Sequence, residues 1–217
     1  MTTSYSCILF DLDGTLVDSS LGIVNSFQHA LAQVGIFEPE ERLLTLIGPP
    51  IAEMLRTLHP ERFADPKLLK RTIDYQRAYY KAQGVHENTL YPSVEDLLYT
   101  LKKHQKKLFI ATSKPTVFAK KILENQKLDH YFEAIIGSNL NLTRTKKSEI
   151  IAHIQKKYLM DAPAIMIGDR HHDILAARQL GIDTVGVTYG YGSEKEIKEA
   201  KPTYIAKNLK DLEAILL

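Results

Sequence analysis

Short apolar runs alternate with amphipathic segments along most of the 217-residue chain. Six of these runs have the length and composition of buried strands and lie at residues 5–10, 107–112, 134–137, 164–167, 184–187 and 204–206. Between them, apolar residues recur at helical spacing, as in Val94, Leu97 and Leu101. This alternation is typical of βαβ units with right-handed crossovers around a parallel sheet. We therefore predict an α/β fold with a doubly wound, Rossmann-like parallel sheet.

Residues 19–88 break this alternation, because they show helical periodicity, as in the spacing of Ile23 and Phe27, but no convincing strand. A helical insert of about 70 residues is far longer than an ordinary crossover connection. We predict that residues 19–88 form a small all-helical cap domain. Residues 1–18 and 89–217 then form the Rossmann-like core, which we expect to be the catalytic domain.

Charge and cysteine content limit the classes of partner. The 28 Lys and Arg residues against 26 Asp and Glu residues leave a net charge of +2, too small to favour a nucleic acid. The single cysteine, Cys7, cannot form an internal disulfide. Asp11 ends the apolar run that begins at Cys7 before it reaches the length of a secretion signal or a membrane span. We predict a cytoplasmic protein with no nucleic-acid or membrane partner.

Two carboxylates follow the first predicted strand in the run Asp11-Leu12-Asp13-Gly14-Thr15. In open α/β sheets, ligands bind at the carboxyl ends of the strands. The two-residue spacing of Asp11 and Asp13 puts both side chains on one side of an extended chain, where crowded negative charges require a cation or a shared proton. Gly14 permits a sharp turn, after which backbone N–H groups can point at an anion. Aspartate and glycine also commonly close a strand in a tight turn, so that interpretation stays open.

Two more strands end in residues with compatible chemistry. The second strand leads to Thr112 and Ser113, whose hydroxyl and N–H groups can bind phosphate oxygens or can cap the helix that follows. The fourth strand leads to Asp169, with Asp173 four residues later. At helical spacing these two carboxylates would share one face, although acidic residues also serve as ordinary helix caps. The four carboxylates at the strand ends are hard oxygen donors, so we predict a Mg²⁺ cofactor.

Two other motifs carry no predicted role. His171 and His172 are adjacent, so they do not face one another on a helix, and no cysteine cluster accompanies them as in a zinc site. Gly190-Tyr191-Gly192 is too short and too late in the chain for a dinucleotide-binding fingerprint.

With these motifs, the chain resembles the haloacid dehalogenase (HAD) superfamily, in the phosphoglycolate-phosphatase-like branch with a helical, C1-type cap after the first strand. The run at residues 11–19 is the first motif, residues 112–115 are similar to the second, and residues 167–173 match the fourth. The third motif of the family is a lysine between the second and fourth strands. Lys147, just before a predicted helix, is the favoured candidate, and Lys146 is the alternative.

The resemblance implies that Asp11 attacks phosphorus and becomes an aspartyl-phosphate. Asp13 would protonate the leaving oxygen and then deprotonate the attacking water. Mg²⁺ would be held by the Asp11 carboxylate, the Asp13 carbonyl and Asp169, and Asp173 would bind the ion either directly or through one of its ligands. The implied activity is hydrolysis of a small-molecule phosphomonoester, such as a phosphoglycolate-like, nucleotide or sugar phosphate.

The resemblance also implies phosphate-binding and specificity residues. Thr112, Ser113, Lys147 and the N–H groups from Gly14 onward would bind the phosphoryl oxygens. The cap would choose the leaving group, and its candidate specificity residues are Gly48, Pro49 and Arg56. Alternatively, Arg56 has no binding role, because a charged side chain on a helix is commonly exposed to solvent.

Three other functions use similar residues. A phosphosugar mutase would have the same nucleophile and would form an isomer without free phosphate. A phospho-accepting signalling domain would hold its phosphate for minutes, but it needs neither the insert nor Asp13. A non-catalytic binding protein on the same fold is the third alternative. A Mg²⁺-dependent phosphatase is the predicted function.

Overall fold

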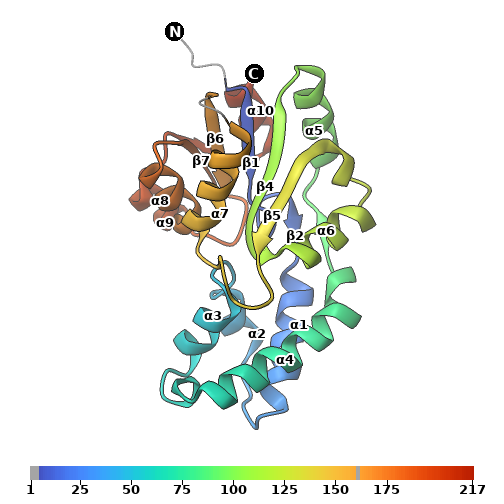
Figure 1. Cartoon of the computed structure of the whole chain (residues 1–217), viewed down its shortest axis with the longest axis vertical. Coiled ribbons are helices and arrows are strands. Elements are labelled where there is room, and N and C mark those ends of the chain that lie inside the picture. The colour runs from blue at the N-terminus through green and yellow to red at the C-terminus, as the bar shows by residue number, and fades with distance from the viewer. Residues whose placement is uncertain (1–4, 160–161) are drawn as a thin grey trace. The chain divides into compact units, whose positions relative to one another are not determined.

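The computed structural model describes residues 5–159 and 162–217. The N-terminal segment predicted to lack a secretion signal includes residues 1–4, which lie outside the described residues. The chain divides into two compact units (Figure 1). One consists of Met1–Asp18 and Leu90–Leu217, and the other of Ser19–Thr89. Among the described residues, no helix combines the length and apolar character that crossing a membrane requires.

The first unit contains a six-stranded sheet in the order β5-β4-β1-β6-β7-β8, with every neighbouring pair parallel. Its strands are β1 Cys7–Phe10, β4 Lys107–Pro115, β5 Phe132–Ser138, β6 Ala164–Gly168, β7 Asp183–Val187 and β8 Tyr204–Ala206. All six predicted strands are present, and the predicted α/β fold is confirmed. Two short strands that were not predicted, β2 Val17–Asp18 and β3 Thr89–Leu90, pair with each other.

Helices cover both faces of this sheet, which explains why all four residues of β1 are apolar and buried. The helices are α5 Val94–Lys103, α6 Thr116–Asn125, α7 Lys147–Ile154, α8 His171–Gln179, α9 Glu194–Ala200 and α10 Leu209–Leu216, with a 3₁₀ turn η3 Asp129–Tyr131 and a π turn η4 Gln155–Leu159. On one face, Cys7 and Leu9 pack with Ile151 of α7 and Ala177 of α8. Figure 1 shows α10 behind the sheet, on the side opposite α7.

Strand β1 lies at the switch point of the sheet, with β4 and β5 on one side and β6 to β8 on the other. Phe10 at its end is level with Ile110 of β4 and Ile167 of β6. The residues that follow these three strands therefore emerge together at the carboxyl edge, where ligands bind in open α/β sheets.

The second unit is helical, as predicted for residues 19–88. It contains α1 Ser20–Ala32, α2 Glu40–Leu44, α3 Ile51–Leu58 and α4 Pro66–Ala82, with 3₁₀ turns η1 Arg62–Ala64 and η2 Gly84–His86. Helices α1 and α4 pack together, and Phe27, Leu55, Phe63 and Ile73 are buried. The unit thus has an apolar core of its own.

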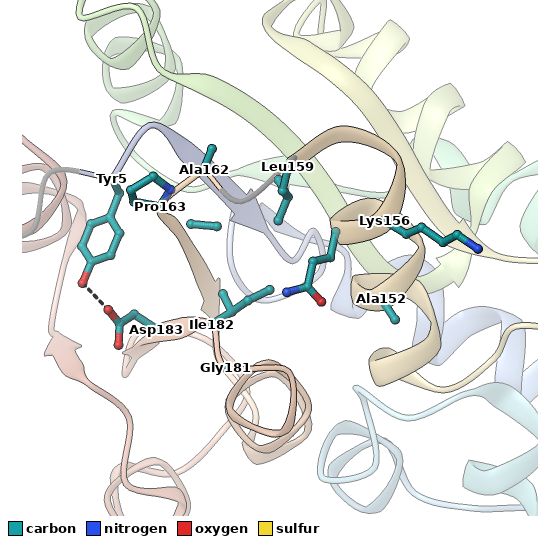
Figure 2. A pocket seen from close by; sticks show the side chains of 11 residues that line it. Tyr5, Ala152, Lys156, Leu159, Ala162, Pro163, Gly181, Ile182 and Asp183 are labelled. Atoms are coloured by element: carbon teal, nitrogen blue, oxygen red, sulfur yellow. Dashed lines mark hydrogen bonds between the residues drawn. The ribbon is translucent and has the colours of Figure 1, made fainter.

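A cavity of about 610 Å³ opens at the amino-terminal edge of the sheet (Figure 2). Tyr5, which precedes β1, donates a hydrogen bond to the Asp183 carboxylate there at 2.8 Å. Leu159 and Ile182 supply apolar lining. None of the predicted site residues lines this cavity. Asp11 and Asp169 follow the opposite, carboxyl ends of their strands.

Candidate active site

Asp11 is the first residue after β1, and its backbone N–H donates to the Ile167 carbonyl at 2.9 Å, which ties the chain to β6. The side chain is buried. Its Oδ1 accepts a hydrogen bond from the Leu12 N–H at 2.8 Å and lies 2.9 Å from Lys147 Nζ. These contacts fix the orientation of the carboxylate at the carboxyl edge of the sheet.

Lys147 is the first residue of α7, so the helix begins one residue earlier than predicted. Its Nζ lies 2.9 Å from Asp11 Oδ1 and 2.7 Å from Asp173 Oδ1, and it donates to the Ala111 carbonyl at 3.0 Å. Burial lowers the pKa of Lys147, but the charges of Asp11 and Asp173 outweigh it, so the pKa lies above its ordinary value and the side chain stays charged. Lys146 occupies the N-cap position of the helix instead. The structure thus places Lys147, and not Lys146, beside Asp11.

Three buried carboxylates form a candidate metal centre. One oxygen from each of Asp11, Asp169 and Asp173 lies within 4.8 Å of the other two. Burial raises the pKa of Asp169 well above its ordinary value, and the charges of Asp173 and Asp11 raise it further. Burial and the charge of Asp11 also raise the pKa of Asp173 to about 6, although Lys147 opposes them. A bound cation would offset this repulsion, and three hard oxygen donors fit a divalent ion such as Mg²⁺.

The predicted shared helical face of Asp169 and Asp173 is wrong, because Asp169 precedes α8 and only Asp173 lies on it. The Asp173 Oδ2 accepts the Arg170 N–H at 3.1 Å, so this carboxylate also caps the helix. Asp169 instead accepts hydrogen bonds from the Tyr191 N–H at 2.8 Å and the Thr15 hydroxyl at 3.3 Å. The turn into α8, and not helical periodicity, brings the two carboxylates together.

The Asp13 carboxylate is not part of this group of three. Its Oδ2 lies 3.0 Å from Lys114 Nζ, and the two side chains are only 13% and 6% exposed. Sequence reasoning missed this role of Lys114. Strand β4 extends to Pro115, three residues beyond the predicted end, and its pairing with β5 is irregular between Ala111 and Pro115. The position of Lys114 directly after Thr112 and Ser113, at the end of this strand, was the signal that could have revealed the lysine.

The Gly14 N–H was predicted to point at an anion. In the structure it donates to the Val17 carbonyl at 2.8 Å instead. The Thr15 N–H likewise donates to the Leu12 carbonyl, within the same turn. Gly14 has a φ of 81°, and a Cβ at this position would overlap with the Asp169 carboxylate. Its role in this structure is to permit the turn and the close approach of Asp169.

Thr112 and Ser113 do not cap the following helix, which begins at Thr116 without a side-chain cap. Thr112 is buried at the end of the apolar part of β4, and its hydroxyl accepts the Lys114 N–H at 3.2 Å. The Ser113 carbonyl accepts a hydrogen bond from the Ser138 hydroxyl at 2.8 Å. The capping alternative is therefore wrong, and the phosphate-binding role remains a prediction.

The candidate specificity residues lie in the helical unit. Gly48 has a φ of 135° and, with Pro49, precedes α3. Arg56 is exposed in the last turn of that helix. Their predicted role in substrate selection remains a prediction.

Comparison with known proteins gives one family. The haloacid dehalogenase-like hydrolase family matches residues 8–187. A 5'-nucleotidase from Pseudomonas aeruginosa is 39% identical over 98% of this chain and 96% of its own. A phosphoglycolate phosphatase from Pasteurella multocida is 32% identical over 99% of each chain. The crystal structure of a predicted phosphatase from Clostridium acetobutylicum has a TM-score of 0.91 and 39% identity, and the match covers 98% of each chain. The chain therefore belongs to the haloacid dehalogenase-like hydrolase family.

Proposed function

We propose that the protein is a Mg²⁺-dependent phosphatase that hydrolyses a small phosphomonoester through an aspartyl-phosphate on Asp11. The observation that best supports this proposal is the contact of buried Asp11 with Lys147, inside a group of three carboxylates suited to a divalent cation. A carboxylate nucleophile beside a cation is the arrangement that attack on a charged phosphate requires, because the negative charges of both reactants must be offset.

In the first step, an Asp11 oxygen attacks phosphorus while the bond from phosphorus to the leaving oxygen breaks. Asp13 gives its proton to that oxygen, so the leaving group departs with a hydroxyl group and not as an alkoxide. Lys147 stabilises the negative charge on the transferring oxygens.

In the second step, Asp13 takes a proton from water as the water oxygen attacks phosphorus. The bond between phosphorus and Asp11 breaks, which releases inorganic phosphate and restores both carboxyl groups. Asp11, Asp169 and Asp173 would hold Mg²⁺, together with the Asp13 carbonyl that the family resemblance implies. Mg²⁺ would supply positive charge that neutralises the phosphoryl oxygens.

Two of the relatives act on different phosphomonoesters, as their names state: a 5'-nucleotidase and a phosphoglycolate phosphatase. We therefore place nucleoside 5'-monophosphates and phosphoglycolate first in a substrate panel, followed by sugar phosphates. In the proposed scheme, the helical unit, with Gly48, Pro49 and Arg56, selects among them.

The test is phosphate release from this panel, with and without Mg²⁺, and with Asp11→Asn as the blank. We expect Mg²⁺-dependent release from at least one ester by the wild-type protein and none by the variant. Conversion of a sugar phosphate to its isomer without free phosphate would contradict the phosphatase proposal.

A further inference from the structure

Residues 189–192, here called the brace segment, follow β7 and contact two parts of the candidate active site. The backbone N–H of Tyr191 donates to Asp169 Oδ2 at 2.8 Å, and its hydroxyl donates to Asp18 Oδ1 at 3.0 Å. The Tyr189 hydroxyl donates to the Thr15 carbonyl at 2.9 Å. The segment thus joins one of the three clustered carboxylates to the loop that follows β1.

The two glycines of the brace segment are required by packing. A Cβ at Gly190 would overlap with the Gly14 carbonyl and the Asp169 side chain, and one at Gly192 would overlap with the Asp169 carbonyl. Neither glycine has a positive φ, so the backbone conformation itself does not demand glycine. Their absent side chains let the segment lie directly against Asp169.

Aromatic packing holds the brace segment in place. The ring of Tyr189 meets that of Tyr91 edge to face, with a centroid distance of 5.1 Å. Tyr191 is held at both ends, by its backbone bond to Asp169 and its hydroxyl bond to Asp18. The position of the Tyr191 N–H is therefore fixed by contacts on either side of it.

We propose that the brace segment is a positioning element of the metal site. It fixes the Asp169 carboxylate through the Tyr191 N–H, while the Thr15 hydroxyl fixes the other oxygen at 3.3 Å. Mutation of a group that orients a metal ligand commonly lowers the metal affinity about 10- to 100-fold. This inference rests on the proposed function in so far as the clustered carboxylates bind Mg²⁺.

The experiment measures Mg²⁺ affinity directly, from the rise in Tm on titration of the whole chain with Mg²⁺. Gly190→Ala displaces the segment and should weaken Mg²⁺ binding about tenfold or more. Tyr191→Phe removes the hydroxyl bond to Asp18 and should weaken binding roughly threefold, a smaller effect of the same kind. The Tm without Mg²⁺ reports any general loss of stability separately.

Two matched controls separate positioning from destabilisation. Gly181→Ala introduces strain at a φ of 70° with no atom within 4 Å of the new Cβ, so it should lower the Tm but leave Mg²⁺ affinity unchanged. Tyr99→Phe removes a hydroxyl from a side chain that is 61% exposed and should change neither quantity.

The outcomes separate this inference from the proposed function. Wild-type affinity in both Gly190→Ala and Tyr191→Phe would overturn the positioning role and leave the phosphatase proposal standing. Absence of Mg²⁺ binding by the wild-type protein would overturn the metal assignment and this inference with it. If Gly190→Ala fails to fold, the test rests on Tyr191→Phe. An unchanged Mg²⁺ affinity in Tyr191→Phe then overturns the inference.

Discussion

Asp11 and Asp13 stand two residues apart, and the structure pairs each with a different lysine. Asp11 lies 2.9 Å from Lys147, and Asp13 lies 3.0 Å from Lys114. The two carboxylates are thereby held in separate environments. This separation suits the two proposed roles, because the nucleophile must face phosphorus while the acid must face the leaving oxygen.

Lys114 is expected to hold Asp13 in position for proton transfer. In Lys114→Met, hydrolysis of an alkyl phosphate should slow about tenfold more than hydrolysis of p-nitrophenyl phosphate, because only the poorer leaving group needs a proton and general acid catalysis is worth about 10²–10⁴. The kcat values of the two esters measure this difference. Lys121→Met, at an exposed position on α6, should leave both rates unchanged. Equal slowing of both esters would contradict the role of Lys114.

Protonation of Asp173 is expected to compete with Mg²⁺. Burial and the Asp11 charge raise the pKa of Asp173 to about 6, so the carboxylate is charged above that pH and neutral below it. Because a ligand must be deprotonated to bind, Mg²⁺ affinity should fall by up to about tenfold per pH unit as the pH drops below 6. Mg²⁺ titrations between pH 5 and pH 8 measure this change. An affinity that is flat down to pH 5 would show that Asp173 takes no part in binding.

At the scale of elements, α9 stabilises the start of α8. The Glu196 carboxylate accepts hydrogen bonds from Arg170 Nε at 2.9 Å and the His171 N–H at 3.0 Å, and lies 2.7 Å from His171 Nδ1. Burial raises the pKa of Glu196, but hydrogen bonds from His171 and Arg170 outweigh it and lower the pKa to about 2. The charged form of Glu196 is therefore the form that stabilises the fold.

Glu196→Gln should reduce the free energy of unfolding by about 1–2 kcal/mol at pH 7, since bonds to a partly exposed charge are lost. The lowered pKa means that this stabilisation is present above pH 4.5 and is lost as the pH falls towards 2, so the difference from wild type should shrink over that range. Urea denaturation at several pH values measures it. Glu199→Gln, on the same helix but 69% exposed, should have little effect. A pH-independent difference would contradict the ionic role of Glu196.

Elements were more predictable from sequence than the contacts between them. All six sheet strands could be predicted from short apolar runs, most clearly for β1, β6 and β7, which are almost wholly buried. In a parallel sheet, Asp11, Thr112 and Asp169 then lie at one edge, because each follows or ends such a run. The two-residue strands β2 and β3 were missed because they are too short to show a period. The contacts of Lys114 and Tyr191 were missed because they join residues far apart in the chain, to Asp13 and Asp169 respectively.

The hydrogen bonds within the turn after β1 could not be predicted from the sequence. The hydrogen bond from the Gly14 N–H to Val17 follows from how the turn closes, which a motif does not specify. A possible signal for Tyr191 was available, since Gly190-Tyr191-Gly192 follows the carboxyl end of a strand next to β6.

At the scale of the whole molecule, the chain forms two units, and the helical one buries apolar residues of its own. Phe63 is 1% exposed there, so Phe63→Ala should reduce stability by about 3–5 kcal/mol through the cavity it leaves. Mg²⁺ affinity should not change, because the clustered carboxylates belong to the other unit. Urea denaturation and Mg²⁺ titration measure the two effects.

Phe37→Ala is the matched control, because Phe37 lies in the same unit and is 84% exposed. It should change stability by no more than about 0.5 kcal/mol. A large loss of Mg²⁺ affinity in folded Phe63→Ala would contradict the independence of the metal site from the core of the helical unit.

The proposed function depends most on the covalent role of Asp11. The direct measurement is acid quenching of the protein during turnover with an identified substrate and Mg²⁺, followed by mapping of any phosphorylated residue by peptide mass spectrometry. We predict a phosphoryl group on Asp11 in the wild-type protein, and neither a phosphoryl group nor released phosphate with Asp11→Asn. Phosphate release by Asp11→Asn at the wild-type rate, or a phosphoryl group trapped on another residue, would contradict the proposal.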